Sequence, residues 1–392
     1  MGLFKKKQPT LPEKFRSKNG IVLSRNYTME TDKKKKGTYH NDVLMIGPSE
    51  ADKVNGFVIP NILQKNASYI INDRGGKLHE RTAEELKAAN YDVIQITLQD
   101  IPDYLYIFNN TTRVEEVELY IKTINQNSPK TEKFWNDMEE KLLSAITWCF
   151  LLQNRGTAWG FKKMLDMVNM FYSPIDEKTT KLDVFIAQIA EMHPNEAGAE
   201  LTKLYEPFKT LHQSNKKIVV DSLKEKLSPF ATNNAPKTLD LSQEKTAIYV
   251  TYDADQENVA LLLSVFYLSV IQQLYSIDNP FTEIIWDNFA DIGIIERLDM
   301  RIIKALSNNV AFLVTADSLN SVTKQFIKDY VTEAFETIIF VGIHDPNTIE
   351  FIRVSAGYIV QKAWTTKDIQ KLMDGKALIL MQGAGVFADE KF

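Results

Sequence analysis

The sequence predicts an α/β protein with a mostly parallel β-sheet, flanked by helices and interrupted by an all-helical insertion. In two stretches of the chain, short apolar runs of strand length alternate with helical patterns, which is typical of parallel strands joined by crossover helices. Between these stretches, apolar residues recur at spacings of three and four, as in helices. A chain of 392 residues is long enough for this two-part architecture.

The first stretch, 40–125, begins the sheet, and the second, 236–392, completes it. The expected strands are short apolar runs, and the four in the second stretch are rich in β-branched and aromatic residues and apolar on both faces, as strands buried inside a parallel sheet are. They lie at 42–47, 68–73, 92–98, 246–252, 282–287, 310–316 and 337–343. The block 126–235 is predicted to be an all-helical insertion domain, and 1–39 a basic segment leading into the sheet domain.

Composition indicates an ordinary globular protein of a reducing compartment. The single cysteine, Cys149, lies among apolar residues and is expected in the core. The apolar run 259–271 is too short to span a bilayer comfortably and is predicted to be a buried helix. The five histidines show no metal-ligand spacing, so no metal site is predicted. The chain opens without a signal peptide, and its expected location is the cytoplasm.

The net charge of -5 argues against nucleic-acid binding driven by overall charge. Two lysine runs, Lys5 to Lys7 and Lys33 to Lys36, are interpreted as a solvated tail and a solvated loop. Contact of these runs with DNA or an anionic membrane is the alternative.

The stretch "DVLMIGPSEADKV", residues 42–54, has the frame of a phosphate-binding loop. In a functional loop, glycines expose backbone N–H groups to the phosphates, and a hydroxyl after the lysine binds magnesium. Here the inner glycine positions hold Glu50 and Asp52, and Val54 has no hydroxyl. We therefore expect a vestigial nucleotide loop made of Gly47, Pro48, Ser49, Glu50, Ala51, Asp52, Lys53 and Val54.

The two carboxylates oppose phosphate binding by charge. A carboxylate about 4 Å from a phosphate oxygen costs on the order of 4 kcal/mol at an effective dielectric constant near 20. Two of them would cancel the roughly 8 kcal/mol that micromolar affinity represents. Lys53 is expected to pair with Glu50 or Asp52 inside the loop, with residual phosphate binding as the alternative.

A second landmark is "TEIIWDNFADIG", where an apolar strand ends at Asp287. This pattern is typical of the acidic strand that holds magnesium in nucleotide hydrolases and is usually followed by a glutamate base. The next residue here is Asn288, whose amide cannot accept a proton at neutral pH. Asp287 as a plain polar strand end or helix cap is the alternative interpretation.

These residues resemble the type IV coupling proteins, the TraG-like conjugative DNA-transfer ATPases, particularly those of Gram-positive bacteria. The resemblance covers about 20–385. It rests on the loop frame followed by "GFVIPNILQ", on "NDRGGKLHERT" where the family has a segment close to TDPKGEL, and on "WDNFADIG" where it has DEFANLG. It implies a RecA-like motor domain of the P-loop NTPase type with an inserted all-alpha domain.

The resemblance also marks the departures from the family pattern. The family's PKGE falls on 74–77, and the aspartate before it is retained as Asp73. Counted without gaps, an arginine common in a later helix falls on Leu306, and the glutamine ending the next strand falls on Asp317. Asn288 replaces the glutamate, and the family's amino-terminal transmembrane region has no counterpart.

The favoured hypothesis is a pseudo-ATPase that serves as scaffold or adaptor in type IV secretion or conjugation, with no cofactor. Its expected partners are proteins of that machinery, such as a relaxase or a true coupling ATPase. The alternative is an active ATP- and magnesium-dependent DNA translocation motor that uses Lys53 and Asp287 in a hexamer. DNA binding without ATP is a third possibility. A monomer is favoured, in the cytoplasm or peripheral at the inner face of the membrane.

Overall fold

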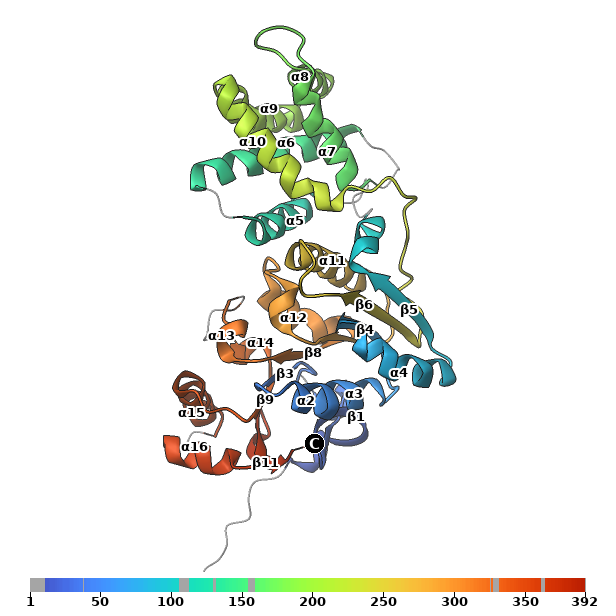
Figure 1. The fold of residues 1–392 in the computed structure, drawn as a ribbon, viewed down its shortest axis with the longest axis vertical. Coiled ribbons are helices and arrows are strands. Elements are labelled where there is room, and N and C mark those ends of the chain that lie inside the picture. Colours follow the sequence, from blue (N-terminus) through green and yellow to red (C-terminus); the bar gives the residue numbers. More distant parts are fainter. Residues whose placement is uncertain are drawn as a thin grey trace, which may run out of the picture.

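A central β-sheet with helices on both faces carries a separate helical part at one end of the molecule (Figure 1). The structure is a computed structural model. It describes residues 11–391 except 38, 106–112, 130–131, 154–158, 325, 327–330 and 361–363. The run Lys5 to Lys7 therefore lies outside the described residues.

The sheet has nine strands within the described residues, in the order β11-β10-β9-β3-β8-β7-β4-β6-β5. Neighbours from β9 to β5 are parallel, as the strand and helix alternation predicts. The strands of this sheet are β3 (Val43–Ile46), β4 (Ser68–Arg74), β5 (Asp92–Thr97), β6 (Thr246–Tyr252), β7 (Thr282–Trp286), β8 (Val310–Ala316), β9 (Thr337–Val341), β10 (Lys376–Met381) and β11 (Gly385–Glu390).

Two antiparallel hairpins were not predicted from the sequence. One joins β10 and β11 and extends the sheet beyond β9. Its tight turn uses Gly383 and Gly385 at positive φ (73° and 110°), which glycine adopts without steric cost. The other hairpin, β1 (Arg16–Ser24) with β2 (Tyr27–Met29), forms a separate two-stranded sheet. The Asp389 carboxylate of β11 accepts hydrogen bonds from Ser24 and Asn26, so the two hairpins are joined.

Helices cover both faces of the sheet. On one face lie α2 (Glu50–Lys53), the π-helical turn η2 (Val54–Val58), α3 (Ile59–Ile62) and α4 (Lys77–Ala88), together with the β1–β2 hairpin. The opposite face is covered by α5 (Val114–Asn127), α11 (Val259–Leu274), α12 (Leu298–Ala305), α13 (Leu319–Val322), α14 (Val331–Ala334), α15 (Pro346–Val360) and α16 (Thr366–Met373). Alternate residues of the strands supply the two cores, because side chains alternate across a sheet.

The helical part consists of α6 (Lys133–Gln153), α7 (Phe161–Asn169), α8 (Lys181–Met192), α9 (Glu196–Lys209) and α10 (Gln213–Leu227). Cys149 is fully buried in it, as predicted. A buried ion pair between Lys226 and Glu139 joins α10 to α6. The helix α5 packs against α6 and also against α11, so it connects the helical part to the sheet (Figure 1).

The predicted fold class is confirmed, with local differences. Short helical turns connect several elements: η1 (Glu13–Phe15), η3 (Leu98–Tyr104), η4 (Met170–Tyr172), η5 (Ser228–Phe230), η6 (Phe289–Ile292) and η7 (Leu306–Asn308). The run expected as a loop forms the short helix α1 (Lys33–Lys36). The apolar run 259–271 forms the buried helix α11, as predicted. Among the described residues, no helix has the length and apolar composition needed to cross a bilayer.

Glu283 is a buried carboxyl group whose charge should limit stability. It lies in β7 opposite Tyr69 of β4, and burial raises its pKa to about 8. Between the ordinary carboxyl pKa and pH 8, the unfolded chain releases this proton while the folded chain retains it. The free energy of unfolding should therefore fall as the pH rises through this window.

We expect Glu283→Gln to raise the free energy of unfolding by about 4 kcal/mol near pH 8 and to have little effect near pH 5, because the amide is never charged. Urea unfolding at the two pH values measures this difference. The exposed Glu244 provides the control, since Glu244→Gln should change stability little at either pH. An equal effect of Glu283→Gln at both pH values would contradict the assignment.

Candidate functional site

The parallel strands bring the predicted site residues to one edge of the sheet. In the sheet, β8 lies between β3 and β7, so the residues that follow these three strands are neighbours at their carboxyl ends. Gly47 follows β3, Asp317 follows β8 and Asp287 follows β7. The Gly47 amide donates a hydrogen bond to the carbonyl of Ala316, 3.0 Å away, which fixes the start of the loop against β8.

The predicted phosphate loop is mostly helix. Helix α2 begins at Glu50 with Ser49 as its N-cap, and the Ser49 hydroxyl accepts a hydrogen bond from the Asp52 amide at 3.2 Å. The amide of Lys53 donates to the Ser49 carbonyl at 3.2 Å, so it is also used within the helix. Across 47–54, all of it described, no residue has a positive φ. The backbone therefore lacks the arched conformation that exposes N–H groups to a phosphate.

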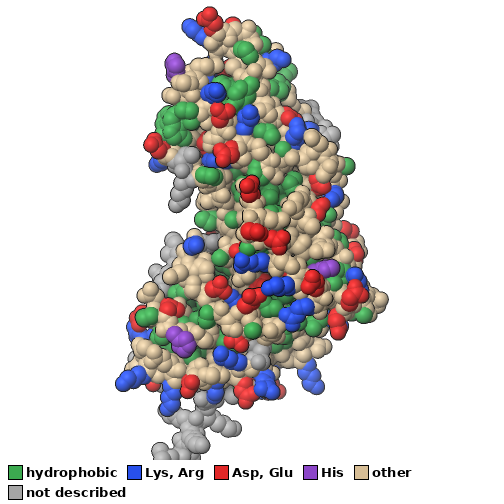
Figure 2. All heavy atoms as spheres, viewed as in Figure 1, with side chains coloured by type: hydrophobic (Ala, Val, Ile, Leu, Met, Phe, Trp, Pro, Cys, Tyr) green, Lys and Arg blue, Asp and Glu red, His purple; other side chains and the backbone are tan. Residues whose placement is uncertain are grey.

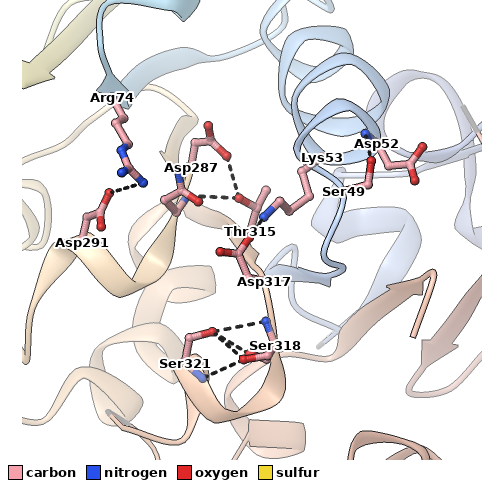
Figure 3. A network of polar contacts seen from close by, with 11 residues as sticks. Ser49, Asp52, Lys53, Arg74, Asp287, Asp291, Thr315, Asp317, Ser318 and Ser321 are labelled. Atoms are coloured by element: carbon pink, nitrogen blue, oxygen red, sulfur yellow. Dashed lines mark hydrogen bonds and ion pairs between the residues drawn. The ribbon is translucent and has the colours of Figure 1, made fainter. Parts of the chain in front are cut away.

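Lys53 is buried, with 3% of its side chain exposed, and its ammonium pairs with the Asp317 carboxylate (Figure 3). The prediction that Lys53 pairs with Glu50 or Asp52 is therefore wrong. Asp52 is adjacent to Lys53 in the sequence and therefore leaves α2 in a different direction. Glu50 is one turn from Lys53 but pairs with Lys77 instead.

The two acidic residues of the loop have partners in distant segments. Glu50 pairs with Lys77 at the start of α4, at 3.4 Å, and this pair is exposed. Asp52 pairs with Lys391, which follows β11, at 3.5 Å. The charges of the loop thus connect α2 to three other parts of the chain.

Asp287 is 7% exposed and lies at the end of β7. One of its carboxylate oxygens accepts a hydrogen bond from the Thr315 hydroxyl at 2.7 Å (Figure 3). Burial raises the pKa of Asp287, while this hydrogen bond and nearby Lys53 act in the opposite direction. The next residue, Asn288, adopts the left-handed conformation (φ 59°), and its backbone N–H donates to the Thr315 hydroxyl at 3.2 Å.

Asp73 caps helix α4 from the end of β4. Its two carboxylate oxygens accept hydrogen bonds from the amides of Leu78 and His79, both at 2.9 Å, and the side chain is fully buried. Burial raises the pKa of Asp73, and these two hydrogen bonds oppose that change. Gly75 and Gly76, at φ 74° and 72°, make the turn between Asp73 and the helix.

Beside the loop, a cleft of about 1100 Å³ opens at the carboxyl ends of β4, β6 and β7. Most of its lining is polar, and Lys53 does not belong to it. The lining residues are Glu50, Ala51, Val54, Asn55, Arg74, Gly75, Lys77, Leu78, Glu80, Arg81, Asp253, Ala254, Asp255, Asp287 and Asn288. This is the edge at which open α/β sheets bind ligands.

Leu306 is not brought to this edge. It lies in η7, which precedes β8, whereas Asp317 follows β8, so the strand separates the two. At about 3.3 Å per residue, a strand of this length spans roughly 20 Å.

Polar strand ends that the sequence interpretation did not single out also contribute. The Thr315 hydroxyl donates a hydrogen bond to the Asp287 carboxylate. The side-chain amide of Asn72 donates to the Tyr252 hydroxyl at 2.8 Å and to the backbone carbonyl of Asp287 at 2.9 Å. Tyr252 in turn donates to Asp291 at 2.8 Å. In the sequence, these residues could have been found as polar side chains near the carboxyl end of otherwise apolar strands.

Comparison with known proteins identifies the family. The family model described as "Type IV secretory system Conjugative DNA transfer" matches residues 4–358 of the chain. The chain belongs to this conjugative DNA transfer family. No curated protein sequence matches it significantly.

Solved structures share the fold of this chain at low sequence identity. The plasmid coupling protein TrwB in complex with ADP and Mg²⁺ superposes with a TM-score of 0.61 and 12% identity, over 98% of this chain and 93% of TrwB. VirB4 of Thermoanaerobacter pseudethanolicus gives a TM-score of 0.55 and 11% identity, over 96% and 97% of the two chains. The predicted RecA-like, P-loop NTPase-type fold with its helical insertion is thereby confirmed.

The burial of Lys53 leads to a stability prediction. Asp317→Asn leaves a buried ammonium without a counter-charge and should lower the free energy of unfolding by about 1 to 3 kcal/mol. The lower end is expected because the Asp317 side chain is 67% exposed and solvent screens the pair. Lys53→Met removes the charge at similar volume and should cost less than about 1 kcal/mol.

Urea unfolding of the two single variants and of the double variant measures these effects. In the double variant, Lys53→Met should remove most of the penalty of Asp317→Asn, because no unpaired buried ammonium remains. A larger loss from Lys53→Met than from Asp317→Asn would show that the lysine has a different main role.

Proposed function

We propose that this chain is a non-catalytic member of its family that acts as a scaffold or adaptor in type IV secretion or conjugative DNA transfer. The observation that carries the proposal is the start of α2 at Glu50. Because the helix takes up the amides of Asp52 and Lys53, these N–H groups are not available to a phosphate.

The side chains at the loop support the same conclusion. The Lys53 ammonium is occupied by Asp317, whereas a functional loop directs its lysine to the phosphates. Glu50 lines the adjacent cleft as a carboxylate, and Val54 supplies no hydroxyl for magnesium. Asn288 stands where a catalytic base is expected and cannot accept the proton of an attacking water at neutral pH.

Under this proposal the chain acts through its surfaces and needs no cofactor. The division into a basic segment (1–39), a sheet domain (40–125 and 236–392) and an all-helical domain (126–235) is part of the proposal. Helix α5 crosses the boundary between 125 and 126. The partners are proteins of the conjugation machinery, either a relaxase or a catalytically active coupling ATPase. We further propose a monomer in the cytoplasm or at the inner face of the membrane.

An ATP-driven motor is the second candidate, because Lys53 and Asp287 lie at the same edge of the sheet on either side of Thr315 (Figure 3). TrwB itself is known in complex with ADP and Mg²⁺. For this chain to bind ATP in that manner, the first turn of α2 would have to unwind and the Lys53 and Asp317 pair would have to separate. The candidate therefore requires a rearranged loop.

Isothermal titration calorimetry with Mg-ATP separates the two candidates. We expect no saturable binding tighter than about 1 mM, because the phosphates meet two carboxylates and too few free N–H groups. Phosphate release should equal that of the buffer, and native mass spectrometry should show the same monomer with and without nucleotide. A coupling protein with an intact phosphate loop is the positive control.

If the chain were an ATP-driven motor, nucleotide binding, turnover and oligomeric state would all give the opposite results. Micromolar Mg-ATP binding with turnover that Lys53→Ala abolishes would refute the proposed function. ATP-dependent hexamers would refute it equally.

A further inference from the structure

The cleft beside the vestigial loop carries more acidic than basic groups. Five carboxylates line it, on Glu50, Glu80, Asp253, Asp255 and Asp287. The cationic lining residues are Arg74, Lys77 and Arg81. Figure 2 shows acidic and basic side chains close together across the middle of the drawn face, below the helical part.

Two of the three cationic groups are already paired. The Arg74 guanidinium lies 3.7 Å from the Asp291 carboxylate, and Lys77 pairs with Glu50. By contrast, neither Asp253 nor Asp255 has an ion-pair partner among the described residues. The carboxylates that remain available therefore give the cleft an acidic character.

Asp287 is the part of this cleft that points most clearly to a ligand. It is more than nine-tenths buried, yet it belongs to the lining, and Thr315 satisfies only one of its two oxygens. Among the described residues, no hydrogen bond reaches the other oxygen, which points away from Thr315 in Figure 3. A desolvated carboxylate with an open acceptor position favours a cationic donor.

The spacing of the acidic groups selects the kind of cation. They come from separate elements: Glu50 from α2, Glu80 from α4, Asp253 and Asp255 from the segment after β6, and Asp287 from the end of β7. Within the described residues, no group of three or more acidic, histidine or cysteine side chains is close enough to hold a metal ion. Several cationic groups at intervals along one chain match this arrangement better than a single ion.

We propose that this cleft is a docking site for a basic segment of a protein partner, with an arginine or lysine of that segment on Asp287. The inference rests on the proposed function and specifies the chemistry of the partner. At about 1100 Å³, the cleft exceeds the usual size of a small-molecule pocket and has room for several residues of peptide. Charge complementarity across such a site sets both the choice of partner and the rate of encounter.

Fluorescence anisotropy with a labelled arginine-glycine repeat peptide tests the proposal on the full chain. The probe should bind saturably at low salt and weaken as salt is added. A glutamate-glycine peptide of the same length should not bind. We expect Asp287→Asn to weaken binding of the basic peptide at least about tenfold, because it removes a desolvated charge but keeps an oxygen to accept from Thr315.

Two further variants distinguish docking in the cleft from general attraction. Asp253→Asn combined with Asp255→Asn should weaken binding about threefold to fivefold, as expected for exposed pairs. Arg81 lines the cleft and has no acidic partner among the described residues, so Arg81→Glu should strengthen peptide binding. Glu225→Gln, an exposed change on α10 outside the cleft, is the matched control and should leave affinity unchanged.

Thermal unfolding of each variant confirms that the fold is intact before affinities are compared. The inference is overturned if the basic peptide does not bind, or if Asp287→Asn and Glu225→Gln bind it equally well. It is also overturned if Arg81→Glu weakens binding, or if the chain prefers a single-stranded DNA probe to the basic peptide. Mg-ATP binding with turnover would instead refute the proposed function, whereas absence of both ATP and peptide binding refutes only the inference.

Discussion

A lysine ammonium removed from water requires a counter-charge, and the arrangement at the edge of this sheet follows from how Lys53 meets that requirement. Its partner is Asp317, at the end of the neighbouring strand β8, so the ion pair holds the first turn of α2 against the residues after β8. With the helix in this position, Ser49 can cap it and the amides of Asp52 and Lys53 are used internally. The same region that in a nucleotide hydrolase opens around phosphates is here closed by contacts within the chain.

Most strands of the parallel sheet could be predicted because they are continuous apolar runs bounded by polar residues; the exception is β5 (Asp92–Thr97), an edge strand that contains Gln95. The hairpin of β10 and β11 was missed although "ALILM" in β10 is such a run, since nothing local distinguishes a buried antiparallel strand from a buried parallel one. Its identity depends on the turn at Gly383 and on pairing with β9, which is a tertiary contact. The hairpin of β1 and β2 was missed because its exposed residues interrupt the apolar pattern.

At the site, residue identity was more predictable than pairing. The sequence was sufficient to identify Lys53, Asp287 and Asn288 as the residues to examine, because they stand at fixed distances from apolar strands. It was not sufficient to assign Asp317 to Lys53, because that pair depends on β8 lying beside β3. Strand order is set by the packing of the whole sheet. The partner of Lys53 therefore follows a distant strand, β8, and is not one of the adjacent loop residues.

The position of β3 also affects how the chain is made. Val43–Ile46 is the first strand of the large sheet to leave the ribosome, yet both of its neighbours, β8 and β9, are encoded far downstream of it. Until β8 and β9 have been made, this short apolar strand lacks both of its neighbours in the sheet. An apolar segment that waits for distant partners in this way is exposed to premature association during synthesis.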